Sequence, residues 1–439
     1  MPPSPEVSPR PSTPLRVGYV IPEFPGQTHV WMWREIVHLR EAGAEVHLFS
    51  TRRPTERDRA RHGFADAARA ETTYLWPMSA GQILGDVTRA KLRHPLGWLK
   101  AVRLAATLPV DGGPAVKTVL PLLLPACRLA REVQRRGITH LHSHTCANSA
   151  VLCMLVRELT CVPYSMTLNA NVEWWGGAMA EKFGRAQFTV AITAWLERQV
   201  REQFPLLRDD QLILGRIGVD TLKWHPPVDR PADDGGPLRI ISVGRLHPSK
   251  GYDVLLDALR RLDGRGVAFD LTLIGDGPQR GELEAKADTL GLADRVTFTG
   301  SLGEDAIIEH MQHADVFVLS SHAEPLGVVT MEAMAMEVAA VATDAGGVGE
   351  IVTDGVDGLL VPPEDAAAMA SALQKLTEDS ALRRRLAAAG RRTIVERFDS
   401  RRGAATLFEK LTGRRPDAML SVLDEAEAGA SAPAEREVA

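Results

Sequence analysis

Cysteine is scarce in this sequence, and aromatic residues make up only 5% of its 439 residues. The four cysteines show no CxxC spacing; they are Cys127, Cys146, Cys153 and Cys161. This scarcity excludes a disulfide-rich scaffold and a zinc ribbon, and it favours reduced thiols in a cytoplasmic protein.

Long apolar runs and an excess of positive charge are also missing. The longest apolar run, TVLPLLLPACRLA, holds two prolines and is too short to cross a bilayer. We therefore expect a protein that is soluble or at most peripheral to a membrane. The net charge of −5 gives no overall basic footprint, so the sequence predicts no nucleic-acid partner.

Strand-like and helix-like runs alternate along the chain. LRVGYVI (15–21) and AEVHLFS (44–50) flank a segment with helical spacing, and the rhythm restarts at residue 238 with LRIISVG, FDLTLIG, ADVFVLS, AAVAT and GLLVP. This alternation is typical of α/β layers, and a chain of this length that is 45% hydrophobic can fill two cores. We predict two Rossmann-like, doubly wound parallel-sheet domains facing a central cleft, with the ligand at the carboxyl ends of the strands.

Composition gives the domain boundaries. Residues 1–14, MPPSPEVSPRPSTP, are proline-rich, and we expect a disordered lead and not a signal peptide. The aperiodic stretch HPPVDRPADDGGP marks a linker at 227–237 between an N-terminal domain, 15–226, and a C-terminal domain, 238–398. Residues 414–439 are expected to form a disordered acidic tail.

Several motifs follow strands in the second half. GRLHPSKG carries Arg245 and Lys250 on a glycine-bounded loop, where two cations suit a diphosphate, although a solvated surface loop is an equal alternative. IGDGPQRG has GxGxxxG spacing, so it does not match the dinucleotide fingerprint, and the pattern argues against a nicotinamide enzyme. Gly346 and Gly347 follow a later strand, where backbone amides can approach a phosphate or a sugar hydroxyl.

EPLGVVTMEAMA places Glu324 and Glu332 eight residues apart. On a continuous helix the two side chains would lie two turns apart, so they do not form one tight pair. If the helix begins near Gly327, both carboxylates can reach one ligand that lies across its N-terminus. The order GRLHPSKG, IGDGP, EPLGVVTMEAMA, DAGGVGEIV and GLLVPPED resembles the retaining glycosyltransferases of family four, which have the two-domain fold called GT-B. The resemblance covers about residues 15–413.

This resemblance assigns roles to the second half. Glu332 would bind the ribose of a nucleotide-sugar donor, UDP- or GDP-linked, and Glu324 would contact the donor sugar. Arg245 and Lys250 would neutralise the diphosphate, with the backbone amides of Gly327, Val328 and Val329. Gly346 and Gly347 complete the expected donor site. The resemblance implies no metal and no other cofactor, and it implies that residues 399–413 form a helix crossing back to the N-terminal domain.

The first half resembles a branch that builds bacterial exopolysaccharides, including colanic acid. FPGQTHVWMWREI is similar to that branch's Phe-Pro-x-x-Ser-Glu-Thr-Phe stretch, but Thr28, His29 and Val30 replace Ser, Glu and Thr. The resemblance makes Gly26, Gln27, Thr28 and His29 candidates for acceptor binding. A histidine that only caps a helix is an equal alternative for His29.

HLHSHTC places His140, His142 and His144 on one face at period two, with Cys146 near, which is a possible metal face. A similar phrase occurs without metal in the family that the chain resembles, so we favour a structural role.

PYSMTLNANVEWWGG departs from the family, because Asn169 stands where a histidine is usual. Asparagine can hydrogen-bond the sugar but cannot carry a proton. Asn171 and Trp174 join the expected acceptor pocket, where an indole can stack on a sugar or belong to the core. The predicted catalytic set is Asn169, Glu324, Arg245 and Lys250.

A second departure is Glu337, which stands near a position where the family usually has a glycine. The departure concerns a turn between a helix and a strand, so we expect a changed loop without loss of chemistry.

Ten basic residues against two acidic ones mark the stretch from Thr88 to Gly137. Such a surface suits anionic lipid, although a solvated helix face is an equal alternative. We predict a retaining hexosyltransferase that moves a sugar from a nucleotide-diphosphate donor to a polyprenyl-linked saccharide of exopolysaccharide or other surface-glycan biosynthesis. We expect the enzyme to lie in the cytoplasm or on the inner face of the cell membrane. The alternatives are a non-catalytic nucleotide- or sugar-binding partner of polysaccharide assembly and another GT-B enzyme such as a nucleotide-sugar epimerase.

Overall fold

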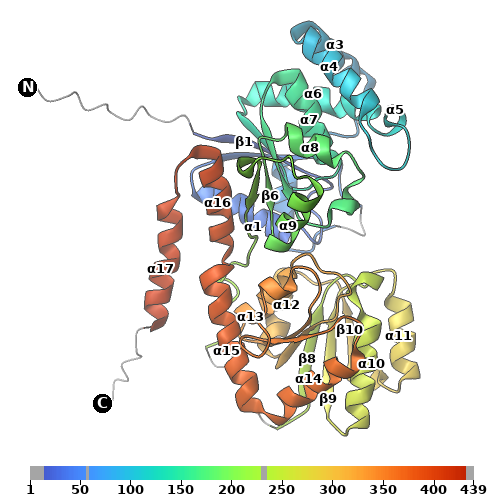
Figure 1. Cartoon of the computed structure of the whole chain (residues 1–439), viewed down its shortest axis with the longest axis vertical. Helices are drawn as coiled ribbons and strands as arrows, with labels where there is room; N and C mark the ends of the chain where they lie inside the picture. Colours follow the sequence, from blue (N-terminus) through green and yellow to red (C-terminus); the bar gives the residue numbers. More distant parts are fainter. Residues whose placement is uncertain (1–13, 56–58, 229–234, 432–439) are drawn as a thin grey trace, which may run out of the picture.

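The computed structural model describes residues 14–55, 59–228 and 235–431. The predicted lead, except residue 14, and residues 229–234 of the predicted linker lie outside the described residues. The chain forms two α/β domains, one above the other in Figure 1, and each is built on a parallel sheet. The predicted α/β architecture of two doubly wound domains is confirmed.

The strands and helices have the following bounds. The first sheet contains β1 (Arg16–Ile21), β2 (Glu45–Ser50), β3 (Thr73–Tyr74), β4 (His140–Ser143), β5 (Tyr164–Leu168), β6 (Phe188–Ala191) and β7 (Leu212–Leu214). The second sheet contains β8 (Leu238–Val243), β9 (Phe269–Ile274), β10 (Val296–Gly300), β11 (Val316–Leu319), β12 (Ala339–Thr343) and β13 (Leu359–Val361). The helices before β8 are α1 (Val30–Glu41), α2 (Ala65–Glu71), α3 (Ala80–Arg93), α4 (Pro95–Thr107), α5 (Ala115–Thr118), α6 (Leu123–Arg136), α7 (Asn148–Thr160), α8 (Met179–Arg185) and α9 (Ala194–Gln203). The helices after β8 are α10 (Tyr252–Gly264), α11 (Arg280–Thr289), α12 (Glu304–Gln312), α13 (Val328–Ala335), α14 (Ala366–Glu378), α15 (Ser380–Arg397), α16 (Ser400–Thr412) and α17 (Asp417–Ser431). Short 3-10 helices are η1 (Leu120–Leu122), η2 (Val172–Trp175), η3 (Asp209–Gln211), η4 (Pro248–Lys250), η5 (Ala293–Arg295) and η6 (Val348–Glu350).

Both sheets reverse their strand order near the middle. The orders are β3-β2-β1-β4-β5-β6-β7 and β10-β9-β8-β11-β12-β13. The reversals fall between β1 and β4 and between β8 and β11, pairs that run parallel. Loops that leave the carboxyl ends of such strands diverge and open a crevice for a ligand. The fold therefore places the loops after β1, β4, β8 and β11 at the two expected binding edges.

Strands β1, β11 and β12 are almost wholly buried because helices cover both faces of each sheet. In β1 only Arg16 is partly exposed, and every residue of β11 and β12 is buried. Among the described residues, no helix is long and apolar enough to cross a membrane.

The chain returns to its first domain after α15. Asp399 caps helix α16 through the amide of Arg401 at 2.8 Å and accepts a 2.6 Å hydrogen bond from the Thr221 hydroxyl. Helix α16 then packs on α1. The segment predicted to cross back, residues 399–413, lies here.

The expectation of disorder over residues 414–439 is wrong for residues 417–431, which form helix α17 beside α16 (Figure 1). Met419 and Leu423 of this helix are buried, and Met419 packs against Ala404 and Ala405 of α16. The alanine- and glutamate-rich composition that suggested disorder also favours a helix, and these apolar side chains give it a packing partner.

Candidate active site

Two loops bring Lys250 and Glu324 together at the reversal point of the second sheet. Lys250 ends the loop after β8, and Glu324 lies in the loop after β11. The Lys250 Nζ atom lies 2.5 Å from Glu324 Oε2, and the Ser321 hydroxyl lies 3.3 Å from the same oxygen. The Ser320 hydroxyl donates to the Lys250 carbonyl at 2.8 Å, which joins the two loops. The structure thus places a partly exposed ion pair where a ligand is expected.

Arg245 and the start of helix α13 lie on either side of this pair in the sequence. Arg245 is exposed and has no ion-pair partner in the part of the chain that the structure describes. Gly327 is the residue before the helix, with a φ of 86°, so α13 begins at Val328 with no side-chain cap. The first amides of a helix have no intrahelical acceptor, and those of Val328 and Val329 are free to meet an anion.

Gly346 and Gly347 pack against the backbone of Glu324 and Pro325. The Gly347 amide donates to the Glu324 carbonyl at 3.0 Å. A Cβ atom would lie 2.5 Å from the Glu324 carbonyl oxygen at Gly346 and 2.0 Å from the Pro325 oxygen at Gly347. Close backbone packing explains both glycines, and the Gly347 amide already has an acceptor within the protein.

Glu332 has a partner from the other domain. Arg34, on helix α1, donates through Nη2 to Glu332 Oε1 and to Glu304 Oε1, each at 2.7 Å. Arg34 and Glu332 are 6% and 5% exposed. The Trp224 ring lies 5.6 Å from the Arg34 guanidinium, and its indole nitrogen donates to Glu304 at 3.0 Å.

The two carboxylates that share Arg34 differ in pKa. Burial alone would raise the pKa of Glu304, but Arg34 and Lys223 outweigh burial and lower it to about 2. Burial raises the pKa of Glu332 by more than Arg34 lowers it, and the nearby carboxylate of Glu304 adds to the rise. Glu304 is thus the firmly ionised partner, and Glu332 is the carboxylate that takes up a proton more readily.

The segments after β1 and β2 contact the loop after β10. The Gln27 amide donates to the Leu302 carbonyl at 2.8 Å, and Arg61 donates to the Ser301 carbonyl at 2.9 Å. His62 accepts from the Glu304 amide at 3.1 Å. Gln27, predicted to bind acceptor, therefore contacts the C-terminal domain in this structure.

The other predicted acceptor residues of this loop have local roles. The Gly26 amide donates to His29 Nδ1 at 3.0 Å, and Thr28 is exposed. His29 precedes helix α1 but makes no side-chain capping bond to it, so the capping alternative does not describe its side chain.

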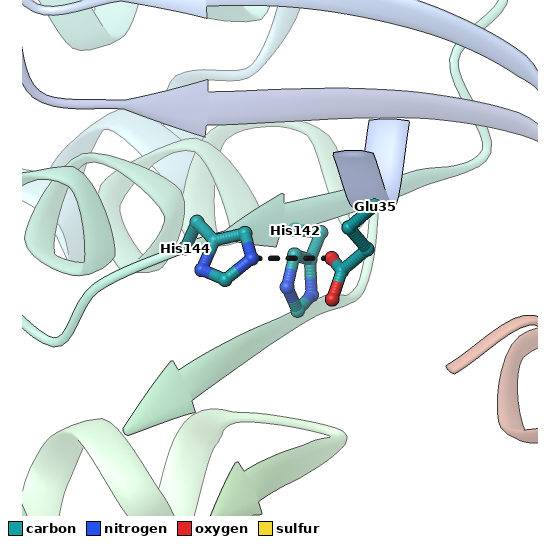
Figure 2. A group of neighbouring side chains, drawn as sticks. All are labelled: Glu35, His142 and His144. Atoms are coloured by element: carbon teal, nitrogen blue, oxygen red, sulfur yellow. Dashed lines mark ion pairs between the residues drawn. The ribbon is translucent and has the colours of Figure 1, made fainter. Parts of the chain in front are cut away.

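A buried polar cluster lies where the first sheet reverses. Figure 2 shows Glu35 of α1 facing His142 of β4 and His144, which follows β4. Glu35 Oε1 lies 3.2 Å from His144 Nε2 and accepts a short hydrogen bond from Tyr19. Burial would raise the pKa of Glu35, but His144, His142 and Tyr19 outweigh it and lower it to about 2.

This cluster has the ligand types of a zinc site, since ligand atoms of Glu35, His142 and His144 lie within 4.8 Å of one another. Both ring nitrogens of His142 already have partners, the hydroxyls of Ser165 at 2.8 Å and Thr167 at 3.1 Å. A metal would have to displace one of them. His144 differs, because neither of its buried ring nitrogens has a hydrogen-bond partner among the described residues, and its Nε2 contacts only the Glu35 carboxylate.

The other two residues of the suspected metal face lie outside this cluster. His140 hydrogen-bonds Ser165 at 2.8 Å, and the Cys146 thiol contacts the Thr167 carbonyl at 3.6 Å.

Asn169 directly follows strand β5, beside this cluster. Its Nδ2 donates to the His144 carbonyl at 3.3 Å, and its Oδ1 is buried with no hydrogen-bond partner among the described residues. Asn171 precedes helix η2, and Trp174 within η2 is 56% exposed. Trp174 is therefore a surface side chain and not part of the core.

Lys182 shapes the loop that follows Trp174. Its buried ammonium donates to the carbonyls of Trp175 at 2.8 Å and Gly177 at 2.9 Å, and burial lowers its pKa. An open cavity of about 390 Å³ lies beside this loop, with Val172, Met179 and Phe204 in its wall.

The sequence motifs did not identify Arg34, Glu304 or Trp224 as parts of the site. No local signal marked Arg34, because at about 100° per residue it lies on the side of helix α1 opposite to Met32, Ile36 and Leu39. All four residues are buried, and the C-terminal domain contacts the Arg34 side.

Residues 229–393 match the family model described as Glycosyl transferases group 1. The glycogen synthase of Mycobacterium tuberculosis is 28% identical over 317 residues, which are 66% of this chain and 73% of the relative. The lipopolysaccharide core biosynthesis glycosyltransferase LpsE of Rhizobium meliloti is 35% identical over 200 residues, 46% of this chain and 55% of its own. The putative colanic acid biosynthesis glycosyltransferase WcaL of Escherichia coli is 35% identical over 176 residues, 38% and 43% of the two chains.

Solved structures share the whole fold. A glycosyltransferase from Rickettsia africae has a TM-score of 0.67 at 15% identity and covers 91% of this chain and 98% of its own. Anabaena Alr3699/HepE in complex with UDP and glucose has a TM-score of 0.67 at 17% identity and covers 91% and 100%. At these identities the likeness shows the fold alone. Residues 229–393 thus resemble the glycosyl transferases group 1 family, and the two facing parallel-sheet domains share the GT-B fold of these solved glycosyltransferases.

Proposed function

We propose that this glycosyltransferase moves a sugar from a nucleoside-diphosphate donor with retention of anomeric configuration. We also propose that its acceptor is a saccharide on a polyprenyl carrier of surface-glycan assembly. The observation that carries the proposal is the Lys250–Glu324 ion pair at the reversal point of the second sheet, on the same loop after β8 that carries the exposed Arg245. Relatives named for lipopolysaccharide core and colanic acid biosynthesis support the surface-glycan assignment.

The proposed chemistry assigns each group a task. Lys250, Arg245 and the first amides of α13 would bind the diphosphate and stabilise its charge as the bond from the anomeric carbon to the phosphate oxygen breaks. These cationic and dipolar groups would make a metal unnecessary. Glu324 would bind donor-sugar hydroxyls, and Asn169 would donate a hydrogen bond near the anomeric carbon. The acceptor oxygen would attack from the same face and pass its proton to the leaving phosphate.

The test of this function is a transfer assay. The purified chain is incubated with UDP- and GDP-sugars and a polyprenyl-linked saccharide extract, and nucleoside diphosphate release and glycolipid mass are followed. We expect acceptor-dependent release and a product one sugar heavier, with the anomeric configuration kept by NMR. An inverted product would exclude retention, and donor conversion without acceptor would favour an epimerase.

Asn169 motivates a second candidate, a nucleotide-binding partner without transferase activity, because it stands where the resembled family has a histidine and an amide cannot carry a proton. In that case the wild type binds nucleotide and transfers nothing, and Asn169→His restores turnover. Transfer by the wild type rules it out.

We propose that the acceptor is reached at a membrane through the hairpin of helices α3 and α4. This hairpin lies at the end of the N-terminal domain remote from the C-terminal domain (Figure 1). Its exposed side chains include Leu84, Leu92, Leu96 and Leu99 together with Arg89, Lys91, Arg93, Lys100 and Arg103. Asp86 is its single acidic residue, and it is buried and paired with Arg131 at 2.6 Å. Exposed leucines among unopposed cations suit an anionic bilayer.

Vesicle flotation tests this surface. The wild type should float with phosphatidylglycerol-containing vesicles and much less with pure phosphatidylcholine vesicles. The double variant Leu92→Ser, Leu96→Ser should lose flotation, while Leu206→Ser, which changes a leucine that is 95% exposed elsewhere in the same domain, should keep it. Equal flotation of all three proteins would contradict the proposal. The predicted cytoplasmic location stays a prediction.

A further inference from the structure

Arg34 has unused hydrogen-bonding capacity at the boundary between the domains. A guanidinium carries five N–H donors on three nitrogens, and in this structure the two ion pairs both use Nη2. Nε and Nη1 are buried and have no hydrogen-bond partner in the described parts of the chain. A buried, unpaired donor is costly, so these two nitrogens indicate a missing acceptor.

Glu332 also has a carboxylate oxygen available for a further hydrogen bond. Arg34 contacts its Oε1, and its Oε2 has no protein partner among the described residues. Glu304, by contrast, is fully engaged, because it also accepts from Lys223 at 2.8 Å and from the Trp224 indole at 3.0 Å. The free capacity of the cluster therefore lies on Arg34 and Glu332 alone.

We infer that Arg34 is a donor-binding residue that the N-terminal domain contributes to the nucleoside end of the site. A free carboxylate oxygen beside free guanidinium N–H groups presents an acceptor and donors together. That pattern suits the vicinal hydroxyls of a ribose, each of which can donate and accept. The inference rests on the proposed function and extends it: ribose binding requires both domains, so the donor site is complete only when α1 lies on α13.

The interdomain contacts near Arg34 agree with this placement. Gln27 and Arg61 donate hydrogen bonds to carbonyls of the loop after β10, which leads to Glu304. These bonds hold the N-terminal domain against the C-terminal domain close to the Arg34 ion pairs. The diphosphate end has no such dependence, because Lys250 and Glu324 both belong to the C-terminal domain.

The test compares ribonucleotides with 2′-deoxyribonucleotides. Isothermal titration measures the Kd values of UDP, GDP and their 2′-deoxy counterparts for the wild type, Arg34→Ala, Arg34→Lys and Arg245→Ala. For the nucleotide that binds, the wild type should prefer the ribo form by about tenfold or more, the usual effect of losing a hydrogen bond to a charged group. Arg34→Lys keeps the positive charge but lacks the planar fork of donors, so it should lose most of this preference while remaining folded by circular dichroism.

Arg245→Ala is the matched control. It should weaken the ribo and deoxy forms equally and leave their ratio unchanged, because it acts on the diphosphate. If both Arg34 variants keep the wild-type ratio, or if they bind nucleotide more tightly, Arg34 does not bind the ribose and the inference is wrong while the donor site stands. If the wild type binds none of the four nucleotides, the proposed donor site fails and this inference fails with it.

Discussion

Glu324 and Glu332 come from one motif, yet their surroundings differ. Glu324 lies in a loop, is partly exposed, and pairs with Lys250 of its own domain. Glu332 lies within helix α13, is buried, and pairs with Arg34 of the other domain. One end of the candidate site is therefore built within the C-terminal domain, and the other end exists only where the two domains meet. Substitutions at the first end should alter chemistry, and substitutions at the second should alter stability and domain contact as well.

Arg34→Ala should have the largest effect on stability. It leaves the buried carboxylates of Glu304 and Glu332 without their shared cation, and breaking such a buried pair costs about 3–5 kcal/mol. Chemical unfolding measures the loss. The control Lys223→Ala removes a half-exposed cation from the same Glu304 and should cost about 1 kcal/mol or less. Equal costs for the two variants would remove the distinction between a buried interdomain pair and a surface pair.

Glu324→Gln should lower the transfer rate by about 10²–10³-fold with little change in unfolding free energy. The amide keeps the size of the side chain but loses the charge that pairs with Lys250 and that, in the proposed mechanism, would orient the sugar. Steady-state kinetics with the donor found in the transfer assay measures this. Glu378→Gln, an exposed carboxylate on α14, should leave the rate unchanged. A Glu324→Gln enzyme with nearly the wild-type rate would contradict the role of this residue.

Arg245→Ala should raise the KM for the donor by about tenfold and leave stability within about 0.5 kcal/mol. Truncating an exposed cation that has no ion-pair partner among the described residues should change the unfolding free energy little. Donor binding should weaken, because the diphosphate would lose a charge-assisted contact. Donor-saturation kinetics and thermal unfolding on the same preparations test both parts. A stability loss above about 1 kcal/mol would mean that Arg245 is a structural residue.

Acid should weaken the interdomain contact through Glu304. Its pKa is lowered to about 2 in the folded state from an ordinary value of 4.5, so its ionised form stabilises the fold above pH 4.5. This contribution falls as the pH drops from 4.5 towards 2. The difference in Tm between the wild type and Glu304→Gln should therefore be constant from about pH 7 to 5 and shrink by about pH 3.5. A difference that grows on acidification would have the wrong sign for a lowered carboxylate pKa.

The smallest expected effect is at Glu337, in the turn that ends α13. Its φ of 54° lies in the left-handed region that glycine adopts without strain, so the turn keeps a glycine-like backbone although the sequence has lost the glycine. Glu337→Gly should raise the unfolding free energy by up to about 1 kcal/mol, because relief of strain is partly offset by a more flexible unfolded chain. Chemical unfolding measures the change, and Met334→Leu on the same helix is the control, because a volume-conserving apolar substitution shows the size of a near-neutral effect. A Glu337→Gly protein less stable than the wild type would show that the side chain contributes more than its backbone strain costs.

The fold was largely accessible from the sequence because buried parallel strands are short apolar runs between helices. Strand β10 was the exception in the second half. Its sequence, VTFTG, lies at the sheet edge and is only partly buried, so it has no continuous apolar run. Helix α17 was missed for a different reason: its composition resembles that of a disordered tail, and only the packing of Met419 and Leu420 against α16 distinguishes it.

The sequence could predict only those site residues that belong to motifs following the strands of one sheet. Arg245, Lys250 and Glu324 follow adjacent strands, and the topology alone brings their loops together. The Arg34–Glu332 pair joins residues 298 positions apart in different domains, and no local pattern encodes that contact. Gly346 and Gly347 show a further limit, because a glycine pair after a strand suits a phosphate and a close backbone contact equally well.

The most direct test of the central claim is thermal unfolding of the wild type and Glu332→Ala with UDP, GDP and ADP. A ligand at about a hundredfold excess over its Kd adds about 2.7 kcal/mol to the unfolding free energy, which gives a clear rise in Tm. We predict that one of these nucleotides stabilises the wild type and that Glu332→Ala loses most of the rise. No shift with any nucleotide at millimolar concentration, or the same shift in both proteins, would contradict a donor site at Glu332.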